Sequence, residues 1–353
     1  MSEKIFMKGC EAVAEAAIRA GCRFYAGYPI TPQNEVPEYL SRMMPKVGGV
    51  FLQGESEVAS ANMLYAGGVS GTRSMTTSSS CGISLMSEAI SWMALNRVPA
   101  VIGNFARGGP GIGSIQPSQQ DYMQATKASG NGGFQMIVLA PATVQEAVDM
   151  TYEAFDLADK YVFPTYILLD GFIGTMMEPV VLPPAKTDEE IAAIKASKTW
   201  VPRGNGGLNS IGHKPSLDEC NGDDAAMYEE WKKTEVRYET YLTEDAEIIL
   251  SGYGISARIA KSVVNDMRKE GYKVGFIRPL RVNPFPEQAF EELDYSKVRG
   301  ILCTELSKPA LYAVDVKNVV RGRCPVETAL RSGGEIITAD EIYEAAVKLY
   351  GEK

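Results

Sequence analysis

Three polar motifs in the first half of the sequence each come directly after a run of β-branched and aromatic residues that predicts a strand. Thr31 follows one such run, Glu55 and Glu57 follow the next, and Arg107 follows a later one. If these strands are parallel, their carboxyl ends meet at one edge of a sheet, where ligands of open α/β folds bind. A hydroxyl and a guanidinium at that edge can hold a carboxylate.

Each of these residues also has a purely structural interpretation. Thr31 can cap the next helix, Glu55 and Glu57 can stabilise the dipole of a helix start, and Arg107 can be a surface charge. The hydroxyl run Thr76–Ser80 can line a polar pocket, but Cys81 beside it has no base motif and is expected to be a small buried cysteine. Spacing alone leaves these alternatives open.

The composition excludes several classes of protein. His213 is the sole histidine, and no two of the six cysteines are closer than twelve positions, so Ser-His-Asp, zinc-ribbon and iron–sulfur motifs are missing and no metal site is expected in this chain. A net charge of −9 argues against nucleic acid as a partner. No long apolar run predicts a membrane segment, and the N-terminus lacks a signal-like apolar stretch, so a cytoplasmic protein with reduced thiols is expected.

The order of predicted elements indicates an α/β fold with two doubly wound domains. Helical and strand patterns alternate from the N-terminus to about residue 171 and again after residue 246. We expect a first domain at 1–180, a linker or arm at 181–245 and a second, smaller domain at 246–353.

The predicted linker is rich in Gly, Pro, Asn and Asp and has no sustained apolar period until a helix expected at 228–242. Structureless segments of this length are usually either mobile or held by a partner, and the apolar residues within this one favour a partner. Trp200, Leu208 and Ile211 would be its apolar anchors, so we expect this arm to contact another chain.

Gly252, Gly254 and Ala257 in the second domain fit the G-x-G-x-x-A pattern of dinucleotide sites. The acidic residue expected about twenty positions later is missing, and the next strand, 272–280, carries Arg278 near its end. NAD is therefore disfavoured and NADP barely tolerated. A tight strand-to-helix turn that requires small residues is the favoured interpretation.

Taken together, the motifs resemble one family. YPITP at 28–32, ESE at 55–57, TTSSS at 76–80, ARGGPGIG at 106–113 and SQQDY at 118–122 resemble the alpha chain of the 2-oxoacid:ferredoxin oxidoreductases, and more narrowly its branched-chain (3-methyl-2-oxobutanoate) branch. The first domain is similar to the pyrimidine-binding domain of thiamine diphosphate enzymes. The second domain is similar to the C-terminal domain of transketolases.

The resemblance implies a role for particular residues. Glu57 matches the family carboxylate that hydrogen-bonds the cofactor's aminopyrimidine ring, and Tyr28, Pro29 and Ile30 match the segment beside the cofactor. Thr31 and Arg107 match positions near the carboxylate of the substrate. The implied reaction converts a 2-oxoacid, CoA and oxidised ferredoxin into acyl-CoA, CO2 and reduced ferredoxin.

The resemblance also implies partner subunits. A beta chain would supply Mg, the diphosphate site and at least one [4Fe–4S] cluster, because the GDG…Asn motif and a ferredoxin-type cysteine run are missing from this sequence. A gamma chain and often a small ferredoxin-like delta chain would complete the complex. We expect this chain not to perform the whole reaction alone.

Two departures from the family bear on the substrate. Relatives have T-S-G-P-G where this sequence has Ser78–Gly82, and the branched-chain group often has a histidine in the stretch that here reads Ala128–Gly132. The alternatives are a 2-oxoglutarate enzyme, a non-catalytic scaffold subunit of such a complex and, from the Gly252 turn, an NADP-binding reductase. The presence of Glu57, Thr31 and Arg107 together argues against a scaffold.

Overall fold

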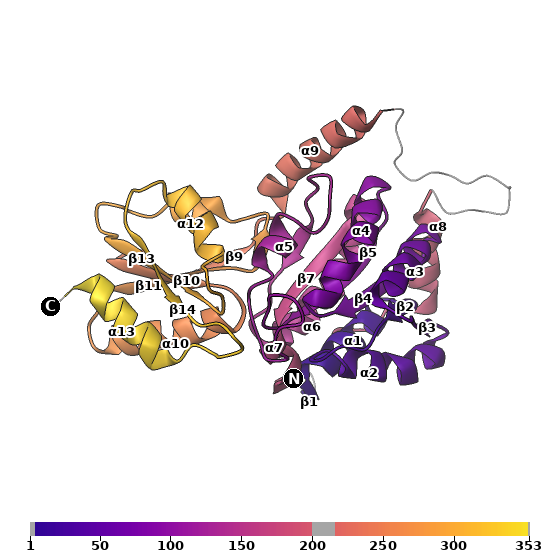
Figure 1. Cartoon of the computed structure of the whole chain (residues 1–353), viewed down its shortest axis with the longest axis horizontal. Coiled ribbons are helices and arrows are strands. Elements are labelled where there is room, and N and C mark those ends of the chain that lie inside the picture. Colours follow the sequence, from indigo (N-terminus) through magenta and orange to yellow (C-terminus); the bar gives the residue numbers. More distant parts are fainter. Residues whose placement is uncertain (1–3, 200–215, 352–353) are drawn as a thin grey trace.

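The computed structural model describes residues 4–199 and 216–351, which form two α/β domains side by side (Figure 1). The first domain is built on a seven-stranded sheet and the second on a five-stranded sheet. This arrangement confirms the predicted α/β fold with two domains. Within the described residues, no helix is both long and apolar enough to cross a membrane.

The seven-stranded sheet has the order β12-β6-β7-β5-β4-β2-β3 and is parallel except at β12. Its central strands β5 and β7 are buried at every position, as expected for parallel strands covered on both faces. The strands are β2 (Phe24–Gly27), β3 (Val50–Gln53), β4 (Ser74–Ser78), β5 (Ala100–Ala106), β6 (Ile137–Leu139), β7 (Pro164–Asp170) and β12 (Arg281–Asn283).

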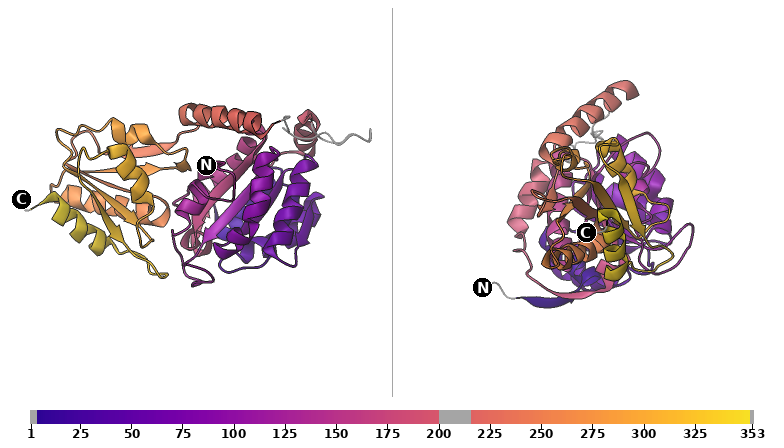
Figure 2. Two further views of the ribbon diagram at one scale, coloured as in Figure 1. Left: turned by 45° about the horizontal axis from the view of Figure 1, so that its top comes forward. Right: turned by 90° about the vertical axis from the view of Figure 1, so that its left-hand side faces the viewer.

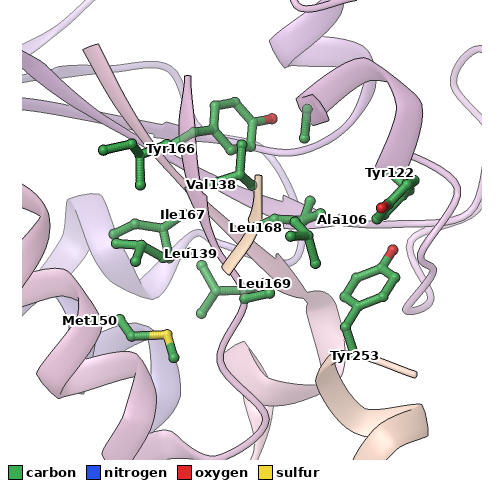
Figure 3. Close-up of a cluster of buried hydrophobic side chains, with 14 of the residues drawn as sticks. Ala106, Tyr122, Val138, Leu139, Met150, Tyr166, Ile167, Leu168, Leu169 and Tyr253 are labelled. Atoms are coloured by element: carbon green, nitrogen blue, oxygen red, sulfur yellow. The ribbon is translucent and has the colours of Figure 1, made fainter. Parts of the chain in front are cut away.

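Helices of the first domain cover this sheet, and their apolar sides form one core with it. Figure 3 shows part of that core, where Val138 of β6 and Ile167, Leu168 and Leu169 of β7 lie together. The helices are α1 (Gly9–Arg19), α2 (Glu35–Met43), η1 (Met44–Val47), α3 (Glu57–Val69), α4 (Cys81–Leu95), α5 (Tyr122–Thr126), α6 (Val144–Tyr161) and α7 (Gly171–Thr175). A separate antiparallel pair joins β1 (Ile5–Lys8) to β8 (Met177–Val180).

The second domain has the sheet order β14-β13-β10-β11-β9, with only β9 antiparallel. Its strands are β9 (Tyr238–Tyr241), β10 (Ile248–Gly252), β11 (Val274–Pro279), β13 (Gly300–Glu305) and β14 (Val326–Leu330). Its helices are α10 (Gly254–Lys269), α11 (Glu287–Glu291), α12 (Tyr312–Val320) and α13 (Ala339–Tyr350). The strand β14 has mixed burial and was not predicted from the sequence.

The segment expected to be an irregular linker contains regular structure, which corrects that interpretation. It holds α8 (Asp188–Ser197), α9 (Leu217–Thr234) and β9, so the helix predicted at 228–242 ends at Thr234 and is followed by a strand. Figure 2 shows α9 as a long helix beside the first domain. Trp231 of α9 is 1% exposed and packs against Tyr161 and Phe163, which explains why a helix of low overall hydrophobicity is held.

The predicted anchors Trp200, Leu208 and Ile211, and the single histidine His213, lie outside the described residues. The second sheet takes in β9, which lies before the boundary expected at 246, and β12 of the expected second domain pairs with β6 in the first sheet. The chain therefore crosses between the two sheets more often than the sequence suggested.

The two domains are joined by buried polar contacts. Arg278 of β11 makes two hydrogen bonds to the carboxylate of Glu146 in α6, at 2.6 and 2.8 Å. Arg281 of β12, which belongs to the first sheet, bonds Glu153 of α6 at 2.7 Å and Glu235, which follows α9, at 2.5 Å. The Arg278–Glu146 pair crosses between the domains, and pairing offsets part of the cost of burying these charges.

Residues of the first domain pack against the turn that follows Gly252. The Ile255 N–H at the start of α10 donates to Asp170 Oδ2 at 2.8 Å. Gly254 has φ +57°, and a Cβ there would lie 2.8 Å from Gln119 Nε2 and closer still to Asp170 Oδ2. The helix start that a dinucleotide diphosphate would need is thus taken by a carboxylate of this chain, which favours the tight-turn interpretation over an NADP site.

Burial raises the pKa of Asp170 to about 6, although the N–H groups of Ile255 and Ile173 oppose the shift. Its ordinary value is about 3.9, so between these two values the folded state binds a proton that the unfolded state has lost. The stabilising effect of that proton is present below about pH 4 and disappears as the pH rises through 6.

We predict that Asp170→Asn, which cannot titrate, removes this pH dependence. The quantity to compare is the free energy of unfolding of the wild type minus that of the variant. This difference should be about 1 kcal/mol smaller at pH 7 than at pH 5. Denaturant unfolding of both proteins at the two pH values measures this difference. Equal changes in the two proteins would show that Asp170 keeps an ordinary pKa.

Candidate active site

Four neighbouring strands of the first sheet, in the order β5-β4-β2-β3, deliver the candidate residues to one edge. Arg107 follows β5, Ser78 ends β4, Thr31 lies in the loop after β2, and Glu57 begins the helix after β3. The structure therefore brings together the three residues that the sequence singled out.

Glu57 is the first residue of α3 and is only 6% exposed. The Ser56 hydroxyl caps the helix by accepting from the Ala59 N–H at 3.2 Å, so capping does not require the glutamate. Among the described residues, no hydrogen bond or ion pair engages the Glu57 carboxylate. Glu55, by contrast, is exposed, so the two acids that looked alike in the sequence have different surroundings.

The Glu57 carboxylate faces Gly82 in the first turn of α4. A Cβ at Gly82 would lie 2.8 Å from Glu57 Oε1 and nearer still to Ser78 Oγ. The hydroxyls of Ser78 and Ser79 are buried and have no hydrogen-bond partner within the described residues. Such groups are costly to leave unpaired, so a polar ligand that bonded them would be stabilised here.

Arg107 is 6% exposed and has no carboxylate partner among the described residues. Its guanidinium donates to the Thr31 carbonyl at 2.9 Å, the Ile112 carbonyl at 3.0 Å and Cys81 Sγ at 3.2 Å. These contacts use three of its five N–H groups, and Nε is buried without a partner. A buried cation with donors to spare favours an anionic ligand.

The loop after β2 carries Tyr28, Pro29, Ile30 and Thr31. Pro29 is exposed and the other three are half-buried. Gln33 secures this loop: its Nε2 donates to the Tyr28 carbonyl at 3.2 Å, and its Oε1 accepts from the Thr77 hydroxyl at 2.5 Å. The sequence did not single out Gln33, and its position one residue after YPITP was the only signal available.

Two further features differ from the sequence-based expectations. Cys81 is half-exposed and contacts Arg107, so it is not the buried cysteine that was expected. Asp121, within the SQQDY motif, bonds Ser80 and Asn104 beside the site, and burial raises its pKa although both hydrogen bonds oppose this. No group of three or more His, Cys, Asp and Glu suited to a metal is found in the described parts of the chain.

Comparison with known proteins identifies the family. Residues 15–216 match the family described as pyruvate flavodoxin/ferredoxin oxidoreductase, thiamine diphosphate-binding, and residues 246–342 match pyruvate:ferredoxin oxidoreductase core domain II. The chain belongs to the 2-oxoacid:ferredoxin oxidoreductase family. It is therefore a subunit of an oxidoreductase that works as a complex, which confirms the predicted family and type of enzyme.

Two characterised relatives span nearly the whole chain. The ketoisovalerate oxidoreductase subunit VorB of Methanothermobacter thermautotrophicus is 41% identical, over 98% of this chain and 98% of its own length. The 2-oxoglutarate synthase subunit KorA of the same organism is 33% identical, over 99% of this chain and 100% of its own length.

Solved structures share the fold. A 2-oxoglutarate:ferredoxin oxidoreductase from Magnetococcus marinus aligns with a TM-score of 0.84 at 22% identity, covering 99% of this chain and 66% of that one. This chain thus spans about two thirds of that protein chain. A split-gene transketolase aligns with a TM-score of 0.60 at 13% identity, covering 98% of each chain. These likenesses confirm the predicted domain types.

The residues in the pocket fit a thiamine diphosphate pyrimidine ring, which carries both hydrogen-bond donors and acceptors. Within residues 4–199 and 216–351 the Ser78 and Ser79 hydroxyls have no hydrogen-bond partner, and the Glu57 carboxylate lies against Gly82, close to Ser78. A bound ring can satisfy these buried polar groups, as their desolvation requires.

Gly82→Ala is predicted to weaken thiamine diphosphate binding at least about tenfold, because the new methyl would collide with Ser78 and the Glu57 carboxylate. Gly222→Ala in α9 is the matched control, since its Cβ would meet no atom within 4 Å. Titration of the assembled complex with the cofactor measures both. Unchanged affinity in Gly82→Ala would place the pyrimidine elsewhere.

Proposed function

We propose that this chain is the alpha subunit of a complex that oxidatively decarboxylates 3-methyl-2-oxobutanoate, with CoA as acyl acceptor and ferredoxin as electron acceptor. The observation that carries the proposal is the buried Arg107 guanidinium, which has no acid partner in the described parts of the chain and lies on the same sheet edge as the buried Glu57, whose carboxylate has no hydrogen-bond partner there either. The 41% identity to a ketoisovalerate oxidoreductase subunit, against 33% to a 2-oxoglutarate synthase subunit, supports the substrate.

Glu57 would hold the cofactor in its reactive form. Thiamine diphosphate, when bound, supplies a carbon nucleophile for the keto group of a 2-oxoacid. Glu57 would exchange a proton with the ring nitrogen of the aminopyrimidine, and its burial strengthens that hydrogen bond. Tyr28, Pro29 and Ile30, on the loop that Gln33 secures, would border the cofactor.

Arg107 and Thr31 would bind the carboxylate that all 2-oxoacids share. The two unused N–H groups of Arg107 are suited to a charge-assisted hydrogen bond. Because Arg107 also donates to the Thr31 carbonyl, it holds the loop that carries the Thr31 hydroxyl. Binding the substrate would therefore not require either residue to move far.

Partner subunits would complete the site. A beta subunit would supply Mg, the diphosphate site and [4Fe–4S] clusters, and a gamma and a small ferredoxin-like delta subunit would complete the complex. Exposed apolar side chains support a contact with another chain: Leu85 lies on α4, and Ile112 and Ile115 lie on the loop after Arg107. A cytoplasmic location stays a prediction.

The main alternative is a 2-oxoglutarate enzyme, supported by the KorA relative. A scaffold subunit without catalysis is a further alternative. Purifying the native complex through this chain and assaying CoA-dependent oxidation of 3-methyl-2-oxobutanoate, pyruvate and 2-oxoglutarate tests the proposal. Lack of activity toward all three would refute it, and preference for 2-oxoglutarate would reassign the substrate.

Glu57→Gln in the assembled complex is expected to lower turnover about 10²- to 10⁴-fold, because the amide keeps the shape but not the basic carboxylate. Cofactor affinity should change less. The control is Glu55→Gln, which alters an exposed acid two residues away. Equal, small effects of both substitutions would indicate that Glu57 only stabilises the helix start.

Arg107→Ala is expected to lower kcat/KM about 10- to 150-fold for every 2-oxoacid accepted, since a charge-assisted hydrogen bond contributes roughly 1.5 to 3 kcal/mol. Thr31→Val removes a neutral donor and should cost less. Kinetics with the three 2-oxoacids separate the possible roles. Loss confined to 2-oxoglutarate would mean that Arg107 binds a side-chain carboxylate, and no loss at all would contradict substrate binding.

A further inference from the structure

A closed network of hydrogen bonds holds the backbone of Arg107. The Ser80 hydroxyl accepts from the Arg107 N–H at 2.9 Å and lies 3.0 Å from the Arg107 carbonyl. The same hydroxyl donates to Asp121 Oδ2 at 2.6 Å. Asn104 completes the network: its Nδ2 donates to Asp121 Oδ2 at 2.8 Å, and its Oδ1 accepts from the Ser80 N–H at 3.0 Å.

Ser80 adopts a backbone conformation that disfavours a side chain, with φ +31° and ψ −87°. Glycine would be less strained at such a position, and strain of this kind persists only where surrounding contacts compensate for it. The compensating contacts here are those to Asp121, Asn104 and Arg107. The serine hydroxyl is therefore needed by the network rather than by the turn.

The network connects to both sides of the proposed site. Ser80 directly precedes Cys81, whose sulfur accepts from the Arg107 guanidinium, and Gly82, which lies against Glu57. The network therefore holds Arg107 by its backbone and also places the helix start that contacts its side chain.

Asp121 is itself fixed by residues next to it in the sequence. Gln119 bonds the Tyr253 carbonyl at 2.7 Å and the Leu306 N–H at 2.9 Å, both in the second domain. The Tyr122 hydroxyl donates to Asp315 of α12 at 2.6 Å. Figure 3 shows the rings of Tyr122 and Tyr253 facing each other, with centroids 5.5 Å apart. The segment is thus anchored on the second domain.

We propose that Asp121 is a positioning residue for the reaction: it acts through Ser80 and Asn104 to hold Arg107 where it binds the substrate carboxylate. This inference rests on the proposed role of Arg107. It gives the second domain a function in catalysis, because that domain anchors the segment from which Asp121 reaches the site.

The test is a double-mutant cycle in the assembled complex. Asp121→Ala removes the acceptor that the Ser80 hydroxyl and the Asn104 Nδ2 group share, and should lower kcat/KM for the 2-oxoacid about 10- to 100-fold. In an Arg107→Ala background the same substitution should cost less than about threefold, because the residue through which it acts is gone. Asp121→Asn, which keeps one acceptor oxygen, should restore most of the loss.

Asp224→Ala is the control, since it removes another carboxylate with a hydrogen-bonded partner, Arg97 at 2.8 Å, that lies outside the network and outside its anchor on the second domain. Its kcat/KM should stay within about threefold of wild type. If Asp121→Ala does not assemble, Ser80→Gly provides a second variant: it relieves the strained backbone but removes the hydroxyl, so thermal stability should hold while kcat/KM falls.

The outcomes separate the two hypotheses. If Asp121→Ala costs as much in the Arg107→Ala background as in wild type, Asp121 does not act through Arg107 and this inference is wrong, while the proposed role of Arg107 stands. If Asp224→Ala is as damaging as Asp121→Ala, the effect is general destabilisation and the inference is also wrong. If Arg107→Ala alone has no effect, the proposed role of Arg107 is wrong, and the inference that rests on it is wrong as well.

Discussion

The buried guanidinium of Arg107 is the group on which the proposed active site depends. Removing a cation from water without a counter-charge is costly, and here two backbone carbonyls and one sulfur offset only part of that cost. A substrate carboxylate would supply the missing charge. The site is thus arranged to be most stable when an anion is bound, which is a reasonable property for an enzyme whose substrates all carry one.

The contacts to this buried cation come from several parts of the fold. The loop of Thr31, the start of α4 and the loop at Ile112 each contribute one acceptor, and each follows or precedes a different element of the first sheet. The second domain adds a further constraint through Gln119, whose side chain is bonded to both the Tyr253 and Leu306 backbones. A substitution far from Arg107 in the sequence can therefore alter how well Arg107 would bind a substrate carboxylate.

The comparisons and the geometry bear on different questions. The relatives establish the family, whereas the surroundings of Glu57 and Glu55 distinguish a buried, unbonded carboxylate from an exposed one. Membership of the family alone would also be compatible with a subunit whose active site has lost its function. The Ser78 and Ser79 hydroxyls, which have no hydrogen-bond partner within the described residues, are polar groups that a cofactor ring could satisfy, and the absence of a side chain at Gly82 lets Ser78 and Glu57 approach the start of α4 closely.

The sequence by itself determined the alternation of strands and helices, because hydrophobic periodicity is local, and it determined the candidates Thr31, Glu57 and Arg107, because strand ends of a parallel sheet converge. Residue spacing could not rank Glu57 above Glu55, although the family resemblance did, since burial depends on α4, which begins 24 residues later. The sequence predicted a helix at 228–242 but not the bounds of α9, whose Trp231 packs against distant rings, and it did not predict the pairing of β12 with the first sheet. Only the tertiary structure decided these points, because they depend on contacts between residues far apart in the chain.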